Sequence, residues 1–132
     1  MAAVPVTNAF FWLITAQLIH ALEEYAFELW VVFAPTRYFS GLVSENVELG
    51  YILINITIIL AGYFCCFKII ATGSNWTNFI ILFWLFFETG NGLGHIVLSG
   101  LLGYHIPGLF TSPLLLIAAF VLWRSWKIEK SL

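Results

Sequence analysis

The sequence predicts an all-α integral membrane protein, a bundle of four transmembrane helices with both termini in the cytoplasm. Of the 132 residues, 61% are hydrophobic and only 9% are charged, whereas about 25% of the residues of a soluble domain are charged. A soluble fold of this length buries one modest core, so the remaining apolar side chains would cover its surface in water. This composition excludes a water-soluble globular protein.

Four apolar stretches supply the predicted helices, because a bilayer core about 30 Å thick needs about 20 apolar residues per helix. We expect the first stretch to end at Pro35 and the fourth to begin at Pro107, since proline is favoured in the first turn of a helix. The connection from Thr36 to Glu48 is expected to be solvated. All four helices belong to one domain, residues 1–132. The predicted spans are residues 7–34, 49–70, 78–101 and 107–123.

The basic residues indicate how the chain is oriented in the membrane. With a cytoplasmic N-terminus, Arg37 lies outside and the other basic residues lie inside, which follows the positive-inside rule. Those inside are Lys68, Arg124, Lys127 and Lys130. Tyr51 and Tyr104 are then expected among the aromatic side chains of the outer interface. A net charge of −2 provides no basic surface for nucleic acid, which excludes that class of partner.

Ionisable residues in the first stretch indicate a function beyond anchoring. His20, Glu23 and Glu24 are followed one turn later by Glu28. Each such residue costs roughly 2.5 to 3.5 kcal/mol at the centre of a transmembrane helix, and it normally faces the interior of a bundle. Helical spacing places His20, Glu24 and Glu28 on one stripe, whereas Glu23 points roughly 100° away from it. The polar side chains of this helix are therefore expected to contact two neighbouring helices.

The third stretch repeats this pattern with Glu88, Asn91 and His95. These residues are separated by one or two helical turns, so all three project from one face. Gly90 and Gly94 form a pair of small residues that is expected to let another helix approach closely. Close packing accounts for the glycines but not for the ionisable side chains.

The polar groups of all four predicted helices lie at nearly the same depth in the membrane, when a rise of about 1.5 Å per residue is counted from the helix ends. This convergence predicts a polar pocket in the outer half of the bundle. Four polar residues are expected to have structural roles. Gln17 and Asn55 are expected to form hydrogen bonds between helices, and Thr111 and Ser112 to bond back to their own helix.

Three ordered motifs carry a resemblance to a known family, and they extend over most of the chain. They are His20-x-x-Glu23-Glu24, Asn91-x-x-x-His95 and Tyr104-x-x-Pro107-Gly108. The sequence resembles the HXXEE family of small bacterial integral membrane proteins. The resemblance implies that the motif residues matter, and that the chain is a multi-pass protein of the bacterial cytoplasmic membrane with an enzymatic activity of unspecified reaction.

The first functional hypothesis is an intramembrane enzyme that acts on a lipophilic small molecule within the membrane lipid. Paired carboxylates in an apolar site do not both ionise readily, and a nearby imidazole favours the charged form of one, which provides an acid and a base. An isomerase-like or cyclase-like reaction would need no cofactor. The candidate catalytic residues are His20, Glu23, Glu24, Glu88, Asn91, His95 and Tyr104, and the aromatic residues expected to hold the substrate are Phe10, Phe11, Phe27, Trp84 and Phe87.

A divalent metal is a second hypothesis for the same residues. His20, Glu24 and His95 would be the core ligands, a set that suits zinc, iron or manganese. Glu23 or Glu88 would complete the ligand shell. Metal-bound water or oxygen would then support hydrolysis or oxidation.

Two further classes of function stay open. Buried glutamate and histidine side chains also form proton relays, so the protein would serve in proton or metal-ion transport or sensing, with a homo-oligomer forming the pathway. Alternatively, the chain would be a structural subunit of a membrane complex. In that case substitution of His20 or Glu24 would change assembly or stability alone.

Overall fold

All regular structure in residues 4–131, the part of the chain that the computed structural model describes, is helical. This confirms the predicted all-α class. The helices in chain order are α1 (Val6–Ala26), α2 (Leu29–Val32), α3 (Ala34–Val43), α4 (Val47–Cys65), the π-helical segment η1 (Cys66–Ile70), α5 (Thr77–Leu102) and α6 (Ser112–Glu129).

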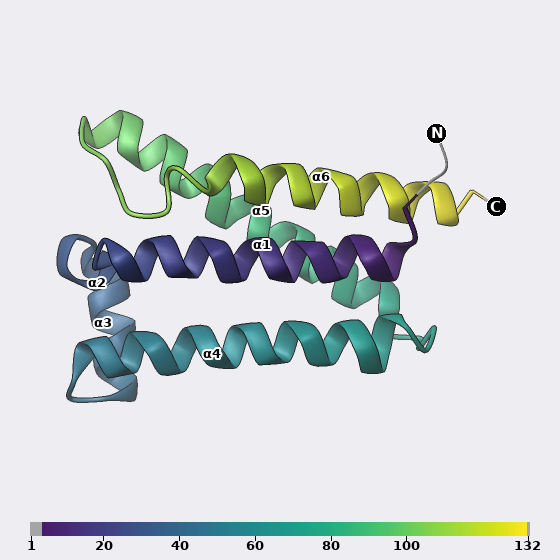
Figure 1. Cartoon of the computed structure of the whole chain (residues 1–132), viewed down its shortest axis with the longest axis horizontal. Coiled ribbons are helices and arrows are strands. Elements are labelled where there is room, and N and C mark those ends of the chain that lie inside the picture. Colours follow the sequence, from purple (N-terminus) through teal and green to yellow (C-terminus); the bar gives the residue numbers. More distant parts are fainter. Residues whose placement is uncertain (1–3, 132) are drawn as a thin grey trace.

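The long helices α1, α4, α5 and α6 extend along the molecule, and each runs opposite to the long helix before it in the chain (Figure 1). Helix α1 packs against α6 on one side and α4 on the other, and α5 packs against α6. Helices α2 and α3 and the connection between α5 and α6 lie at one end, here called the α3 end. The start of α1, η1 and the end of α6 lie at the opposite end, the η1 end.

Two of the described helices are long and apolar enough to cross a membrane. The first joins α4 and η1 in the 24 residues Val47–Ile70, and the second is α5, with 26 residues. At about 1.5 Å per residue they measure about 36 and 39 Å, which exceeds a hydrocarbon core of about 30 Å. Their bounds lie close to the predicted stretches 49–70 and 78–101.

Two apolar clusters leave room for polar side chains between them. The larger cluster occupies the η1 end and includes Phe10, Leu13 and Ile81, which are fully buried. The smaller cluster lies at the α3 end, where the rings of Trp30 and Tyr51 are tilted by 40° with their centroids 4.9 Å apart. The buried polar residues of α1 follow directly after its contribution to the larger cluster.

Helix α1 ends at Ala26, so the prediction that the first helix continues to residue 34 is wrong. Glu28 has a left-handed backbone with φ +52°, which interrupts the helix. The apolar residues that follow pack into the smaller cluster through Leu29 instead of continuing along the axis of α1. Pro35 lies in the first turn of α3, where its missing N–H costs nothing. The predicted solvated connection 36–48 is therefore largely helical.

Helix α6 begins at Ser112, five positions after the predicted start at Pro107, and it extends to Glu129 rather than 123. Pro113 occupies its first turn, which is the role that was expected of Pro107. The difference arises at Gly108, whose φ of +100° is incompatible with a right-handed helix. The segment that precedes α6 is therefore free to fold across the neighbouring helices.

Candidate functional site

A buried cluster of three side chains lies near the α3 end of the molecule: His20 and Glu24 of α1 and His95 of α5. His20 and Glu24 are four residues apart, so both project from one face of α1. Oε1 of Glu24 lies 2.9 Å from Nε2 of His95 and 3.4 Å from Nε2 of His20. The imidazole rings meet edge to face, with centroids 4.8 Å apart. The structure thus brings together the three residues that the sequence analysis named as core metal ligands.

Thr111 links this cluster to Glu23. Its hydroxyl oxygen lies 2.8 Å from Nδ1 of His20 and 2.5 Å from Oε2 of Glu23. Glu23 also accepts the backbone N–H groups of Phe110 and Thr111, at 3.1 and 2.8 Å. The expectation that Thr111 bonds mainly within its own helix is wrong, because its short hydrogen bonds are to α1. Glu23 therefore fastens the start of α6 to α1.

Gly108 allows the segment before α6 to pass directly over both imidazoles. A Cβ atom at this position would lie 2.8 Å from Cε1 of His20 and 2.8 Å from Cε1 of His95. The positive φ of Gly108 is also one that residues with side chains rarely adopt. Only a glycine meets both requirements without displacing the cluster.

Glu24 connects the cluster to a cavity of about 580 Å³. Tyr51 of α4 donates a hydrogen bond of 2.8 Å to Oε2 of Glu24, and both residues lie on the cavity wall. The two carboxylate oxygens therefore have different surroundings. Oε1 contacts the imidazoles, and Oε2 contacts a hydroxyl group at the edge of the cavity.

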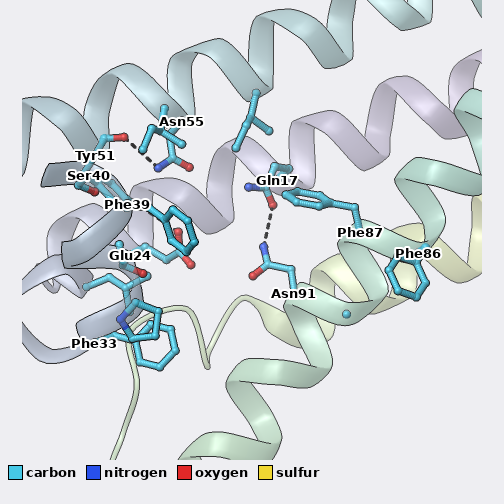
Figure 2. Close-up of a pocket in the computed structure, with 16 residues that line it drawn as sticks. Gln17, Glu24, Phe33, Phe39, Ser40, Tyr51, Asn55, Phe86, Phe87 and Asn91 are labelled. Carbon is cyan, nitrogen blue, oxygen red and sulfur yellow. Dashed lines mark hydrogen bonds between the residues drawn. The ribbon is translucent and has the colours of Figure 1, made fainter. Parts of the chain in front are cut away.

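The cavity walls are mainly apolar, with a few polar groups between α1, α4 and α5. Figure 2 shows Gln17 of α1 pointing toward Asn91 of α5, whose Nδ2 donates to Oε1 of Gln17 at 3.3 Å. This confirms the predicted interhelical role of Gln17. Asn55 donates instead to the carbonyl of Tyr51 in its own helix, so its predicted interhelical bond is wrong.

The aromatic residues that line the cavity differ from those predicted. Among the predicted set, Phe87 lies on the wall. Phe33 and Phe39 come from the region around the connection that was expected to be solvated, and α5 adds Phe86 to the wall (Figure 2). The remaining predicted residues belong to the core (Phe10, Trp84), pack against it (Phe11) or are exposed (Phe27).

The predicted close approach at Gly90 and Gly94 does not occur. A Cβ atom at either position would have no heavy atom within 4 Å. Gly92 instead faces α6, where a Cβ atom would lie 3.1 Å from the Leu116 side chain. Gly90 contributes to the cavity wall, so a small residue at this position widens the cavity rather than tightening a helix pair.

The chain matches, over residues 11–123, the family described as protein of unknown function with HXXEE motif. The chain belongs to the HXXEE family. No curated protein and no solved structure shows significant similarity to it. The HXXEE motif itself is His20-Ala21-Leu22-Glu23-Glu24, and its ionisable residues divide into two groups in the structure. His20 and Glu24 form the buried cluster, and Glu23 holds the segment before α6.

Four predicted catalytic residues of this HXXEE protein lie outside the cluster, namely Glu23 and Asn91, described above, and Tyr104 and Glu88, and their catalytic role stays a prediction. Tyr104 is 50% exposed and lines a separate surface pocket with His105. Glu88 is fully buried and does not belong to the group of converging ligand atoms.

The contact of Tyr51 with Glu24 was not predicted from the sequence, because Tyr51 was assigned to the membrane interface. Counting down the second helix places its hydroxyl within about one turn of Glu24, a signal that was available.

Replacement of Glu88 by methionine is expected to stabilise the protein by about 1 to 3 kcal/mol. Neither carboxyl oxygen of Glu88 has a hydrogen-bond partner among the described residues, and the side chain is fully buried. Methionine has a similar length and removes two polar atoms that folding deprives of water. Thermal unfolding in a mild detergent measures the effect, with Glu45→Met as the control at an exposed position. A lower stability of Glu88→Met than of the control contradicts the prediction.

Proposed function

We propose that this HXXEE protein is an intramembrane enzyme that moves protons to and from a lipophilic small molecule, with Glu24 as the group that carries the proton. The observation that supports this most strongly is the position of the Glu24 carboxylate. It contacts two imidazoles through Oε1 and borders the cavity beside Tyr51 through Oε2. A molecule in the cavity would therefore have the Oε2 atom of Glu24 beside it as the base that accepts its proton.

The chemistry that this arrangement favours is an isomerisation or a cyclisation. A carboxylate removes a proton from carbon, and a neighbouring acid returns one at a second position. The Tyr51 hydroxyl is a donor at the cavity edge, and Asn91 and Gln17 offer further polar contacts to a substrate headgroup. The apolar walls suit a hydrocarbon body, since ligand sites combine apolar surface with a few polar groups.

The proposal places the protein in a bacterial membrane as a multi-pass protein with four spans, α1, α4 with η1, α5 and α6. Outward-facing apolar side chains on the two shorter spans support this, for example Trp12 on α1 at 61% exposure and Ile117 on α6 at 62%. Cytoplasmic termini are supported by Lys68 and Lys127, which lie in η1 and the last turn of α6 at the η1 end. Arg37 belongs to α3 at the opposite end.

Transport is less well supported than catalysis. An ion pathway needs polar groups across the thickness of the membrane. Between Glu88 and the η1 end, the described core is built mainly from fully buried apolar residues such as Leu13, Ile81 and Leu122. The polar groups therefore form a pocket that ends within the bundle, which favours an enzyme over a conduit.

Deuterium incorporation tests the proposal even while the substrate is unidentified. The full chain in lipid nanodiscs would be incubated in D₂O with a neutral-lipid extract of bacterial membranes, and mass spectrometry would identify molecules that acquire deuterium at carbon. We expect the wild type to label at least one lipophilic species. Glu24→Gln should reduce the rate by about 10²- to 10⁴-fold, the usual contribution of a general acid or base.

Glu45→Gln is the matched control, because it makes the same chemical change at an exposed position. Size-exclusion chromatography would establish that each variant remains folded. Equal labelling by wild type and folded Glu24→Gln would contradict the proposal, as would the absence of any labelled species with folded wild type. A loss of labelling in Glu24→Gln with unchanged assembly would exclude the purely structural alternative.

A further inference from the structure

The hydrogen bonds around Thr111 determine which nitrogen of His20 carries a proton. Glu23 accepts two backbone N–H groups, so it acts as an acceptor, and its 2.5 Å contact with Thr111 has the length of a charge-assisted O–H···O bond. The single hydroxyl proton of Thr111 therefore points to Glu23. The Thr111 oxygen must then accept a hydrogen bond from Nδ1 of His20, 2.8 Å away.

The other nitrogen of His20, Nε2, is left facing Glu24. This atom is fully buried and has no hydrogen-bond partner among the described residues. In the imidazole tautomer that is protonated at Nδ1, Nε2 presents a lone pair. A lone pair 3.4 Å from a carboxylate oxygen in a buried site is unfavourable unless a cation lies between the two atoms. Nε2 of His95 approaches the same oxygen from α5.

We propose that this cation is a divalent metal ion, zinc in the first place, held by Nε2 of His20, Nε2 of His95 and a carboxylate oxygen of Glu24. One potential ligand atom from each residue lies within 4.8 Å of the other two. Zinc bonds of about 2.0 to 2.2 Å in tetrahedral geometry separate ligand atoms by about 3.3 to 3.6 Å, a range that includes the His20–Glu24 distance of 3.4 Å. Two imidazoles and one carboxylate with a fourth position open are the donor set of many catalytic zinc sites.

Glu23 and Thr111 are positioning residues for this metal. A histidine that binds a metal usually donates its other ring N–H to a partner that holds the ring in place, and loss of such a partner weakens metal binding about 10- to 100-fold. Here Thr111 receives that N–H from His20, and Glu23 orients the Thr111 hydroxyl. The inference thus gives a role to the glutamate of the HXXEE motif that does not reach the cluster.

This inference concerns the same site as the proposed function and deepens it, but it does not depend on catalysis. A metal on Oε1 would lie on the imidazole side of Glu24, whereas Oε2 and Tyr51 lie on the cavity wall. When bound, the metal would supply a Lewis acid next to the proposed proton-carrying group. Binding is measurable in the absence of any substrate.

The test is metal analysis of the full chain, extracted in a mild detergent without chelators or a polyhistidine tag. We expect about one equivalent of metal per chain by mass spectrometry of the elements, and rebinding of Zn²⁺ after the protein has been stripped. X-ray absorption of the zinc-loaded protein should show nitrogen or oxygen neighbours at about 2.0 to 2.1 Å. Thr111→Val should weaken Zn²⁺ binding about 10- to 100-fold.

Three further variants decide the assignment. His95→Gln and Glu24→Gln should lose stoichiometric Zn²⁺ binding, whereas His105→Gln should retain it, because His105 is the one remaining histidine and is not a member of the cluster. Size-exclusion elution of each variant would establish that it is folded. Folded wild type that neither contains metal nor binds Zn²⁺, iron(II) or Mn²⁺ would overturn the inference, as would equal binding by His95→Gln and His105→Gln. Metal binding without deuterium labelling would support the metal site and contradict the proposed function. Deuterium labelling without metal binding would support the proposed function and overturn the metal site.

Discussion

Substitution of Gly108 by alanine should disrupt the His20–Glu24–His95 cluster and lower the free energy of unfolding by about 3 kcal/mol. Two effects combine at this position. The backbone has φ +100°, which strains any residue with a Cβ atom, and that atom would lie within 2.9 Å of atoms of both imidazoles. The rings have little room to retreat, because His20 is fully buried and His95 nearly so. Thermal and urea unfolding in detergent would measure the loss, and Zn²⁺ binding would report on the cluster.

Gly103→Ala separates the two effects. Gly103 also has a positive φ, +72°, but a Cβ atom there would meet no heavy atom within 4 Å. This variant should therefore lose only the cost of a left-handed backbone, about 1 to 2 kcal/mol, and retain metal binding. Equal stability of Gly108→Ala and Gly103→Ala would show that the close approach of Gly108 to the imidazoles is unimportant.

The helical class and the middle two long helices could be predicted from the sequence. Val47–Ile70 and Thr77–Leu102 are runs of apolar residues whose length and composition identify them without tertiary information. The polar cluster was also accessible, since the spacing of His20 and Glu24 and the estimated depth of His95 depend only on helix geometry. These features share one property, which is that regular periodicity determines them.

The ends of the other two helices could not be predicted, because tertiary contacts decide them. The chain leaves α1 at Glu28 so that Leu29 and Trp30 can pack against α4, and no local residue preference requires that turn. The composition of residues 29–34 is equally suitable for a longer helix. Tertiary packing overrides such a weak local preference.

The partners of the cluster were missed for a related reason. The periodicity of polar residues predicts which side of a helix a residue occupies, but it does not predict which neighbouring helix lies on that side. Thr111 precedes α6 and Tyr51 lies early in α4, so their contacts with His20 and Glu24 depend on how α1 packs between those helices. Counting residues gives the depth of Tyr51, but the packing of the helices is needed to show that its hydroxyl and that of Thr111 reach the cluster.

Substitution of Gly50 by alanine should destabilise the protein by about 3 kcal/mol, through a contact outside the cluster. Gly50 of α4 is buried against α3, and a Cβ atom there would lie 2.0 Å from the carbonyl oxygen of Ser40. Because the obstacle is backbone, no side-chain rotation relieves it, and α3 must move. Helix α3 carries Phe39 and Ser40 on the cavity wall, so the cavity should change shape while Zn²⁺ binding at the cluster is retained.

Gly41→Ala is the matched control, because it makes the same substitution on α3, the helix that Gly50 contacts. Gly41 lies within α3, and a Cβ atom there would meet no heavy atom within 4 Å. Because alanine favours a helix over glycine by about 0.5 to 1 kcal/mol, this variant should be slightly more stable than the wild type. The two glycine-to-alanine substitutions should therefore shift the unfolding midpoint in opposite directions. If both shift it equally, α3 is not held against α4 at Gly50, and the cavity wall formed by α3 is not a stable part of the fold.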